Sequence, residues 1–247
     1  MASLLITGAN RGIGLEFVRQ LAESKEGKWK HIFAACRNPA KAESLQKLAA
    51  IHPHVTPITL DVTDDATIEA AVKEVSSVVK ENGLNVLINN AGIIALEPLE
   101  KVNREMLHEY FNVNTAGPLI IVQKFLPLLK QGAATSKVSG LSFYRGSIFN
   151  MTSGMGSISD NTSGKMYAYR ASKAALNMVS RSLSVDLKAD NILAISLAPG
   201  WVQTDMGGKN ATLKVEDCVS MLLKEMETAG ENENGKVVNF RGGIYPW

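Results

Sequence analysis

A tyrosine and a lysine stand four residues apart in the stretch YRASK, which spans residues 169–173. The surrounding sequence is rich in helix-forming residues and carries apolar residues at helical spacing. Because residues i and i+4 are neighbours on one helix face, we expect Tyr169 and Lys173 to reach a common point. The spacing is weak by itself, since two exposed side chains on a surface helix fit it equally well.

A glycine-rich stretch, TGANRGIG at residues 7–14, follows a short apolar run and precedes an amphipathic one. Gly8, Gly12 and Gly14 allow a tight turn and a close approach of the backbone to a pyrophosphate, which a helix N-terminus attracts. Plain turn formation is the alternative. The position of this stretch at the head of an alternating strand and helix pattern favours dinucleotide binding.

The charges near this turn indicate which dinucleotide. NAD-binding proteins usually place an acid about 20 residues after the glycines, on the ribose hydroxyls. Here the corresponding stretch, ACRNP, has no acid but contains Arg37, and Arg11 lies inside the glycine turn. Two guanidinium groups suit a 2′-phosphate, although two solvated surface arginines would give the same pattern. We therefore expect NADP(H) rather than NAD(H).

Short apolar runs alternate with longer amphipathic stretches along the whole chain, which predicts an α/β fold: a Rossmann-type, doubly wound parallel sheet with helices on both faces. We expect strands at residues 3–8, 31–37, 55–61, 84–92, 146–153, 191–200 and 236–240. We expect helices at residues 12–25, 39–50, 64–82, 103–130, 164–187 and 214–228. The polar residues 131–146 are expected to form a surface excursion.

The composition is that of one ordinary globular domain. No shift in composition marks a linker, so residues 1–247 are predicted to form a single domain, with a cofactor half at about residues 1–130 and a catalytic and substrate half at about residues 131–247. A net charge of +2 from 26 basic and 24 acidic side chains gives no reason to expect a nucleic-acid or membrane partner.

The cysteines and histidines give no sign of a disulfide-rich or metal-binding protein. The two cysteines, Cys36 and Cys218, form no disulfide framework, which indicates a reducing, cytoplasmic location. No histidine has metal-ligand spacing, so we expect no metal; the histidines are His31, His52, His54 and His108.

Together the motifs resemble the short-chain dehydrogenase/reductase family over nearly the whole chain. The pieces occur in the family's order: the turn from Thr7 to Gly14, the pair Asp61 and Val62, NNAG from Asn89 to Gly92, Asn114, Ser153, the pair Tyr169 and Lys173, and PGWVQTDM at residues 199–206. The stretches TGANRGIGLEFV, PGWVQTDM and GGIYPW are most similar to sniffer-type carbonyl reductases.

The resemblance implies a set of cofactor contacts, with Asp61 and Val62 at the adenine and Thr204 at the nicotinamide amide. The implied cofactor-binding residues are Gly8, Asn10, Arg11, Gly12, Ile13, Gly14, Arg37, Asp61, Val62, Asn90, Ala91, Gly92, Tyr169, Lys173, Pro199, Gly200, Val202 and Thr204.

The chemistry of this family answers what the phenol and the ammonium would do together. Hydride delivery to a carbonyl leaves an alkoxide that must receive a proton. A free tyrosine, with a pKa of about 10, is a poor donor near neutral pH, and we expect Lys173 to lower that pKa. Tyr169 is thus the predicted general acid, and Ser153 is predicted to orient the substrate oxygen. Tyr167 is excluded as the acid because Ala171 stands where its lysine would be.

Asn114 can also be argued from its neighbours. Pro118, four residues later, cannot donate the helical hydrogen bond that the carbonyl of Asn114 would accept, and Gly117 loosens the same turn. A freed carbonyl beside Lys173 could hold a water and supply protons, the role that the resemblance assigns to this asparagine. A kink needed only for packing is the alternative.

The predicted function is NADPH-dependent reduction of aldehyde or ketone carbonyls, with Asn114, Ser153, Tyr169 and Lys173 as the catalytic set. Trp201 is a candidate substrate contact beside Ser153 and Tyr169, and packing alone is the alternative for both Trp201 and Trp247. The partners expected are a small-molecule carbonyl substrate and further copies of the chain, in a dimer or tetramer. Two alternatives stay open: oxidation of an alcohol or steroid, and a non-catalytic dinucleotide-binding sensor or interaction protein.

Overall fold

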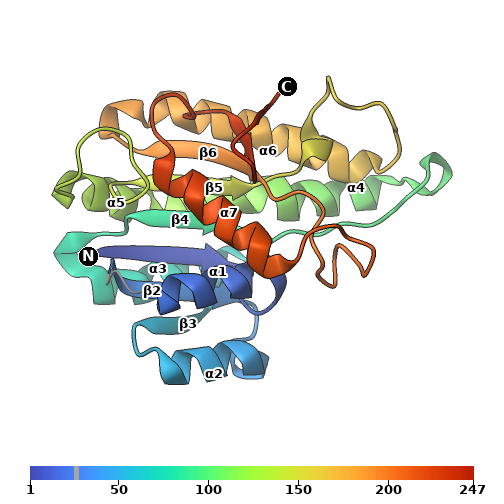
Figure 1. Ribbon diagram of the computed structural model, residues 1–247. Helices are drawn as coiled ribbons and strands as arrows, with labels where there is room; N and C mark the ends of the chain where they lie inside the picture. Colours follow the sequence, from blue (N-terminus) through green and yellow to red (C-terminus); the bar gives the residue numbers. More distant parts are fainter. Residues whose placement is uncertain (25–27) are drawn as a thin grey trace.

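The computed structural model describes residues 1–24 and 28–247, and its centre is one eight-stranded sheet (Figure 1). The strand order is β3-β2-β1-β4-β5-β6-β7-β8, and every neighbouring pair is parallel except β7 and β8. The strands are β1 (Ala2–Thr7), β2 (Trp29–Cys36), β3 (Val55–Thr59), β4 (Val86–Asn89), β5 (Ser147–Met151), β6 (Leu193–Ala198), β7 (Val237–Asn239) and β8 (Ile244–Tyr245). The order reverses between β1 and β4, which is where open α/β sheets bind ligands.

Helices cover both faces of the sheet (Figure 1). The helices are α1 (Gly12–Glu23), α2 (Glu43–Ile51), α3 (Asp65–Val79), α4 (Arg104–Phe111), α5 (Gly117–Thr135), α6 (Tyr167–Asp186) and α7 (Val215–Thr228). Their apolar residues pack with alternate sheet residues into two large clusters, one with α1, α2 and α7 and the other with α3 and α5. The predicted doubly wound fold is therefore confirmed.

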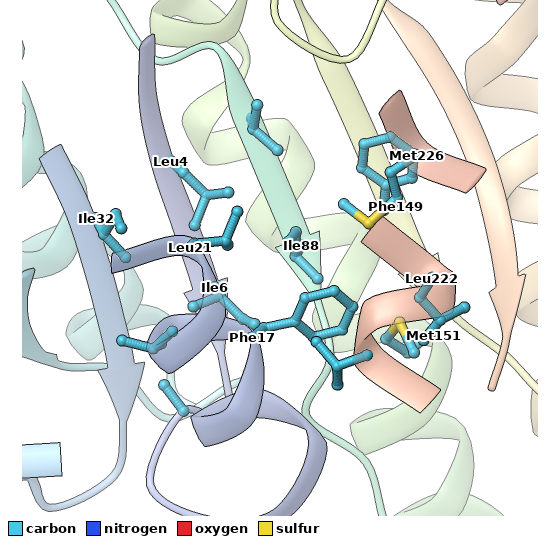
Figure 2. Close-up of a cluster of buried hydrophobic side chains, with 14 of the residues drawn as sticks. Leu4, Ile6, Phe17, Leu21, Ile32, Ile88, Phe149, Met151, Leu222 and Met226 are labelled. Atoms are coloured by element: carbon cyan, nitrogen blue, oxygen red, sulfur yellow. The ribbon is translucent and has the colours of Figure 1, made fainter. Parts of the chain in front are cut away.

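The alternation of side chains along the strands explains why both faces are apolar. Leu4 and Ile6 point into the cluster beneath α1 and α7, whereas Leu5 points into the opposite one. Figure 2 shows Phe17 of α1 and Leu222 of α7 packed over this first cluster. Because parallel strands are buried on both faces, they appear in the sequence as nearly continuous apolar runs.

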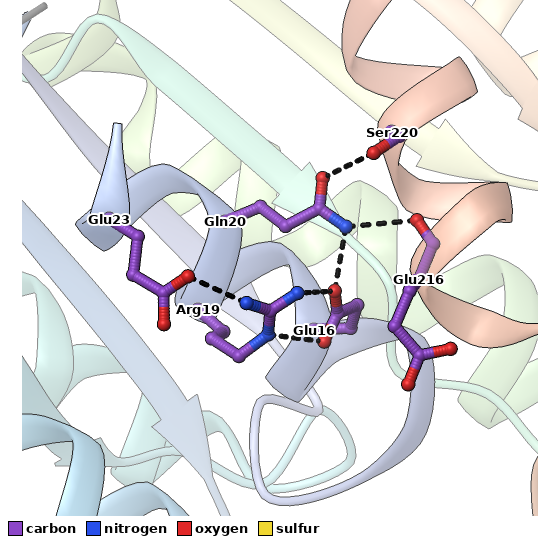
Figure 3. A network of polar contacts seen from close by, with 6 residues as sticks. All are labelled: Glu16, Arg19, Gln20, Glu23, Glu216 and Ser220. Atoms are coloured by element: carbon purple, nitrogen blue, oxygen red, sulfur yellow. Dashed lines mark hydrogen bonds and ion pairs between the residues drawn. The ribbon is translucent and has the colours of Figure 1, made fainter. Parts of the chain in front are cut away.

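A polar network joins α1 to α7 at the edge of this cluster (Figure 3). Gln20 donates to the carbonyl of Glu216 at 2.9 Å and accepts from the hydroxyl of Ser220 at 3.0 Å. Glu16, which is buried, accepts two hydrogen bonds from the guanidinium of Arg19, at 2.8 and 2.5 Å. Burial disfavours the charge of Glu16, but the bonds from Arg19 and Gln20 outweigh it and lower the pKa of this carboxyl.

Several predicted helices have different bounds from those expected. Pro39 begins a separate 3-10 turn, and α2 starts at Glu43. The helix predicted at residues 103–130 is divided by a π-helical turn, Asn112–Ala116, and its second part continues to Thr135. Lys25, the last residue of the helix predicted at 12–25, lies outside the described residues.

The segment at residues 131–146 is a surface excursion only in its middle, where residues 136–142 form an irregular and largely exposed loop. Residues 131–135 complete α5, and Phe143 is fully buried, with its ring 5.5 Å from the rings of Trp29 and Phe149. Tyr144 donates to the carboxylate of Glu227 at 2.6 Å, which fixes the segment to the end of α7. The expectation was therefore wrong at the two ends of the segment, where the polar composition concealed the end of α5 and the buried Phe143.

Candidate active site

The glycine turn joins the end of β1 to α1 and has room for backbone only. Gly8 and Gly12 have φ of 67° and 56°, a conformation that glycine adopts without strain. A Cβ atom on Gly14 would lie 2.2 Å from the carbonyl oxygen of Gly8, so only glycine allows this close packing. The turn thus exposes backbone N–H groups at the head of α1, as a pyrophosphate requires. Ile13, in the same turn, packs against the core.

The stretch NNAG is fastened to this turn. The hydroxyl of Thr7 accepts from the N–H groups of Asn90 and Ala91, both at 3.0 Å, and the side chain of Asn90 donates to the carbonyl of Thr7 at 2.9 Å. Gly92 lies beside Asn114 and α6, since a Cβ there would lie 3.1 Å from Oδ1 of Asn114 and 3.6 Å from Nζ of Lys173. The glycine turn after β1 and the NNAG stretch at the end of β4 therefore form one continuous surface, which we call the floor of the site.

The loop after β6 lies against the same floor. A Cβ on Gly12 would be 3.3 Å from the methyl group of Thr204, which places this threonine at the glycine turn. Gly200 has a φ of 79°, and Val202 is buried and bridges to Leu213. Pro199 accepts a hydrogen bond from Cys218 of α7, so α7 helps to hold the loop.

Trp201 lies in this loop with its indole donating to the carbonyl of Gly207 at 2.7 Å, while the residue stays 53% exposed. Its ring is therefore held in place but largely open to solvent. Substrate contact by Trp201 stays a prediction.

The residues predicted at the adenine follow β3. Oδ1 of Asp61 accepts from the N–H and the hydroxyl of Thr63, at 2.9 and 2.8 Å, which orients the carboxylate. Val62 is only partly buried, and its carbonyl closely approaches Gly117, where a Cβ would lie 2.7 Å away. Gly117, which directly follows the π-helical turn, is thus needed for close packing.

A hollow of about 180 Å³ lies beside the end of β2 and is lined by Asn10, Arg37, Asn38, Lys41 and Ala42. Two cations, Arg37 and Lys41, therefore face one cavity near the glycine turn, and this donor set fits a phosphate. Arg11, the second predicted cation, is absent from this lining and instead forms an ion pair with Asp205 at 2.9 Å. Lys41 was missed because a lysine in an exposed turn carries no distinctive pattern.

The catalytic candidates meet beside the end of β5. Tyr169 and Lys173 lie on one face of α6, both buried, with Nζ 5.8 Å from the centre of the tyrosine ring. Ser153, just after β5, is within hydrogen-bonding reach of the Tyr169 hydroxyl. Lys173 donates to the carbonyl of Met151 at 2.7 Å. Tyr167 is 42% exposed, in contrast to the buried Tyr169.

Burial dominates the electrostatics of the pair. It raises the pKa of Tyr169, and the hydrogen bond with Ser153 opposes that rise. It also lowers the pKa of Lys173 to about 8. The expected lowering of the tyrosine pKa by Lys173 is thus not seen, because burial of the phenol is the largest effect and only the hydrogen bond with Ser153 opposes it. A phenol that keeps its proton at neutral pH is nevertheless the form that donates.

Asn114 is fully buried in the π-helical turn and connects three segments. Its side chain accepts from the N–H of Ile93 at 2.9 Å and donates to the carbonyl of Ile93 at 3.1 Å. It also donates to the hydroxyl of Ser172 at 3.0 Å, which in turn donates to the Tyr169 carbonyl at 2.8 Å. The irregular helix predicted from Pro118 is present; the role of Ser172, inside YRASK itself, was missed.

Residues 1–24 and 28–247 contain no group of three or more histidine, cysteine, aspartate or glutamate residues placed to hold a metal ion. Within the same ranges, none of the helices has the length and apolarity needed to cross a membrane.

Comparison with known proteins identifies the family. The sequence profile described as short chain dehydrogenase matches residues 2–214. The chain is a short-chain dehydrogenase. This short-chain dehydrogenase is an oxidoreductase, and the family predicted from its motifs is confirmed.

Two solved structures resemble this short-chain dehydrogenase throughout. Carbonyl reductase Sniffer of D. melanogaster is 40% identical, with a TM-score of 0.97 and a match that covers 100% of both chains. The NADPH-bound carbonyl reductase from chicken fatty liver is 40% identical, with a TM-score of 0.95, over 100% of this chain and 99% of that one. The C-signal of Myxococcus xanthus is 40% identical over 165 residues, 66% of this chain and 93% of that protein.

Proposed function

We propose that this short-chain dehydrogenase reduces aldehydes or ketones to alcohols, with NADPH as the cofactor and Tyr169 as the general acid. The observation that carries the proposal is the buried phenol of Tyr169, which shares a site with Ser153 and Lys173. The carbonyl reductases at 40% identity support the direction of the reaction. The cationic hollow at Arg37 and Lys41 supports NADP(H) over NAD(H).

The nicotinamide group, when bound, supplies the hydride. The residues of the chain do the rest: the hydroxyl of Ser153 orients the carbonyl oxygen of the substrate, and Tyr169 donates its proton to that oxygen as negative charge develops. Lys173, held by the Met151 carbonyl, keeps a positive charge beside the phenol and lies next to Gly92, and it would also hold the ribose of the cofactor. Asn114 holds Ile93 and Ser172, and thereby the two segments that flank Tyr169.

Binding without catalysis is the alternative from a different class, and the C-signal of Myxococcus xanthus is a relative named for signalling rather than for an enzyme. A non-catalytic protein would have no need of the serine, tyrosine and lysine. All three are present and adjacent here, which favours catalysis. Oxidation of an alcohol would use the same residues in the reverse direction, so the choice between directions rests on the relatives.

Purified protein mixed with NADPH and a panel of aliphatic and aromatic aldehydes and ketones tests the proposal. We expect loss of NADPH absorbance with at least one carbonyl, faster than with NADH at equal concentration, and strong loss of this activity in Ser153→Ala. Tight NADPH binding, seen by fluorescence, without turnover of any carbonyl or alcohol would favour the sensor instead.

We further propose that the chain forms a homo-oligomer, as the sequence predicts. Large apolar side chains are exposed on three neighbouring helices: Leu107 and Phe111 on α4, Leu119 on α5, and Met178 and Val185 on α6. Such exposed apolar groups favour burial against another copy. Sedimentation equilibrium should give twice or four times the mass of the chain, and a monomer at micromolar concentration would contradict this. The cytoplasmic location stays a prediction.

A further inference from the structure

Tyr169 lies in the first turn of its helix, where the backbone N–H groups have no hydrogen-bond partner within the helix. It is the third residue of α6, which begins at Tyr167, and the first backbone hydrogen bond of the helix runs from the N–H of Arg170 to the carbonyl of Met166 at 2.9 Å. The N–H groups of the first turn have no partner within a helix, and helix ends fray. The position of the Tyr169 hydroxyl therefore depends on contacts from outside the helix.

The residue that precedes the helix cannot secure this turn. Met166 is in the left-handed conformation, with φ of 54° and ψ of 43°, and Lys165 before it has a φ of 57°. Non-glycine residues adopt this conformation at an energetic cost, and only where the surroundings enforce it. An N-terminal cap is normally a short polar side chain that accepts from the second or third N–H group, and the thioether of Met166 provides none.

Glu97, which lies in a different segment of the chain, caps the first turn of α6. Its Oε1 accepts from the N–H of Ala168, the second residue of α6, at 3.1 Å. Its backbone carbonyl accepts from the N–H of Met166 at 3.3 Å. Glu97 is only 4% exposed and follows NNAG in the stretch between β4 and α4. The segment that builds the cofactor floor thus also holds the first turn of the catalytic helix.

The second carboxylate oxygen of Glu97 makes this arrangement unusual. Oε2 is buried and has no hydrogen-bond partner among the residues that the structure describes. An unpaired buried oxygen disfavours folding, and the positive end of α6 offsets only part of that effect. Stability alone is therefore a poor reason for a glutamate at this position, whereas fixing the geometry of the first turn is a sufficient one.

We propose that Glu97 is a positioning residue for Tyr169: it caps the first turn of α6 and thereby sets the place of the phenol beside Ser153. The inference rests on the proposed function, since it concerns the proton donor of that reaction. The ring of Tyr169 packs with Tyr110, Met166 and Ala168, so a shift of the capped turn moves the ring with it. Glu97 accepts from the N–H groups of Ala168 and Met166, and it acts on Tyr169 through these two residues.

Three variants test the assignment. Glu97→Ala removes the cap and should lower kcat at least about 10-fold, because small misplacements of a catalytic group have large effects on rate, with NADPH affinity within about twofold of the parent. Glu97→Gln retains the Oε1 acceptor and should restore most of kcat, although the buried NH2 group lowers the melting temperature. Glu100→Ala, an exposed glutamate in the same segment, should behave like the parent.

Recovery of kcat in Glu97→Gln separates positioning from stabilisation. If Glu97 served stability alone, kcat would fall in each variant in proportion to its loss of stability. A Glu97→Ala enzyme with parental kcat, or equal losses of kcat in the alanine and glutamine variants, would overturn the assignment. If Glu97→Ala does not fold, Glu97→Asp takes its place, because the shorter chain draws the acceptor away from Ala168, and the same losses are expected.

Hydrogen exchange distinguishes failure of this inference from failure of the proposed function. The amide of Ala168, which donates to the Glu97 side chain, should exchange faster in Glu97→Ala than in the parent and should be protected again in Glu97→Gln. This readout needs no substrate. Unchanged exchange at Ala168 in Glu97→Ala overturns the capping contact. If exchange at Ala168 does change in this variant but the parent reduces no carbonyl, the proposed function is overturned instead.

Discussion

Lys173 lies one helical turn from Tyr169, but its ammonium donates to the carbonyl of Met151 at 2.7 Å rather than to the phenol. Its Nζ is 5.8 Å from the centre of the tyrosine ring. The lysine is thus fixed by the end of β5, the same strand end that presents Ser153. The strand positions the serine and the cation together, and α6 brings the tyrosine to both.

The pH dependence of catalysis should report this buried lysine. Burial lowers the pKa of Lys173 to about 8 from the ordinary 10.5, so its ammonium is present below about pH 8 and is lost as pH rises through that value. For reduction, kcat/KM for NADPH, which reports groups of the free enzyme, should therefore decline above about pH 8. The same burial makes the folded state bind this proton less tightly than the unfolded chain, so between about 8 and 10.5 the stability contribution of this group increases with pH. A rate profile that is flat across pH 8 would contradict the assignment.

Cofactor preference should depend on the hollow beside β2. Arg37→Asp removes a phosphate partner and adds repulsion, so NADPH affinity should fall by about 10- to 100-fold, the effect of losing a charged hydrogen bond, while NADH binding holds or improves. Lys41→Ala should weaken NADPH in the same direction, because Lys41 lines the same cavity. Arg11→Ala serves as the comparison, and its effect should be smaller because Arg11 is paired with Asp205. Unchanged NADPH affinity in Arg37→Asp, measured by fluorescence titration, would exclude this phosphate site.

The network between α1 and α7 should stabilise the protein in a pH-dependent way. The pKa of Glu16 is lowered, so its contribution is present above the ordinary value of 4.5 and is lost as pH falls below it. Glu16→Gln should reduce the free energy of unfolding at neutral pH by about 1–2 kcal/mol, a discounted value because Arg19 is partly exposed. Glu23→Gln breaks only the outer ion pair and should cost about 0.5 kcal/mol or less. Equal effects of the two variants in denaturant titrations would refute this.

The prediction of a single domain stays open to a direct test. One sheet order runs from β3 to β8 and joins the cofactor and catalytic halves, so we expect one cooperative unfolding transition by calorimetry. Limited proteolysis should yield no pair of stable fragments that divides near residue 130. Two separately folded fragments would show that the halves are independent.

The fold and the motif residues could be predicted from the sequence because both show as patterns among residues close together in the chain. Apolar runs marked the strands, and the glycine turn and YRASK needed only short spacings. Contacts between distant segments were not accessible: Glu97 and Ala168 are separated by 71 positions, and no local pattern connects them. The burial of Phe143 was missed for the same reason, since its partners Trp29 and Phe149 lie on different strands. The pKa of Tyr169 was mispredicted because the extent of burial is a property of packing.

The most direct test of the proposed mechanism is steady-state carbonyl reduction by Tyr169→Phe, with NADPH affinity measured separately by fluorescence. The variant keeps the ring and loses one hydroxyl, so packing and NADPH binding should persist. Turnover should fall by at least about 100-fold, the lower range for positioned acid catalysis. Tyr167→Phe, whose hydroxyl belongs to a side chain that is largely exposed, should keep most of the activity. If Tyr169→Phe turns over like the parent while Tyr167→Phe is inactive, Tyr169 is not the proton donor.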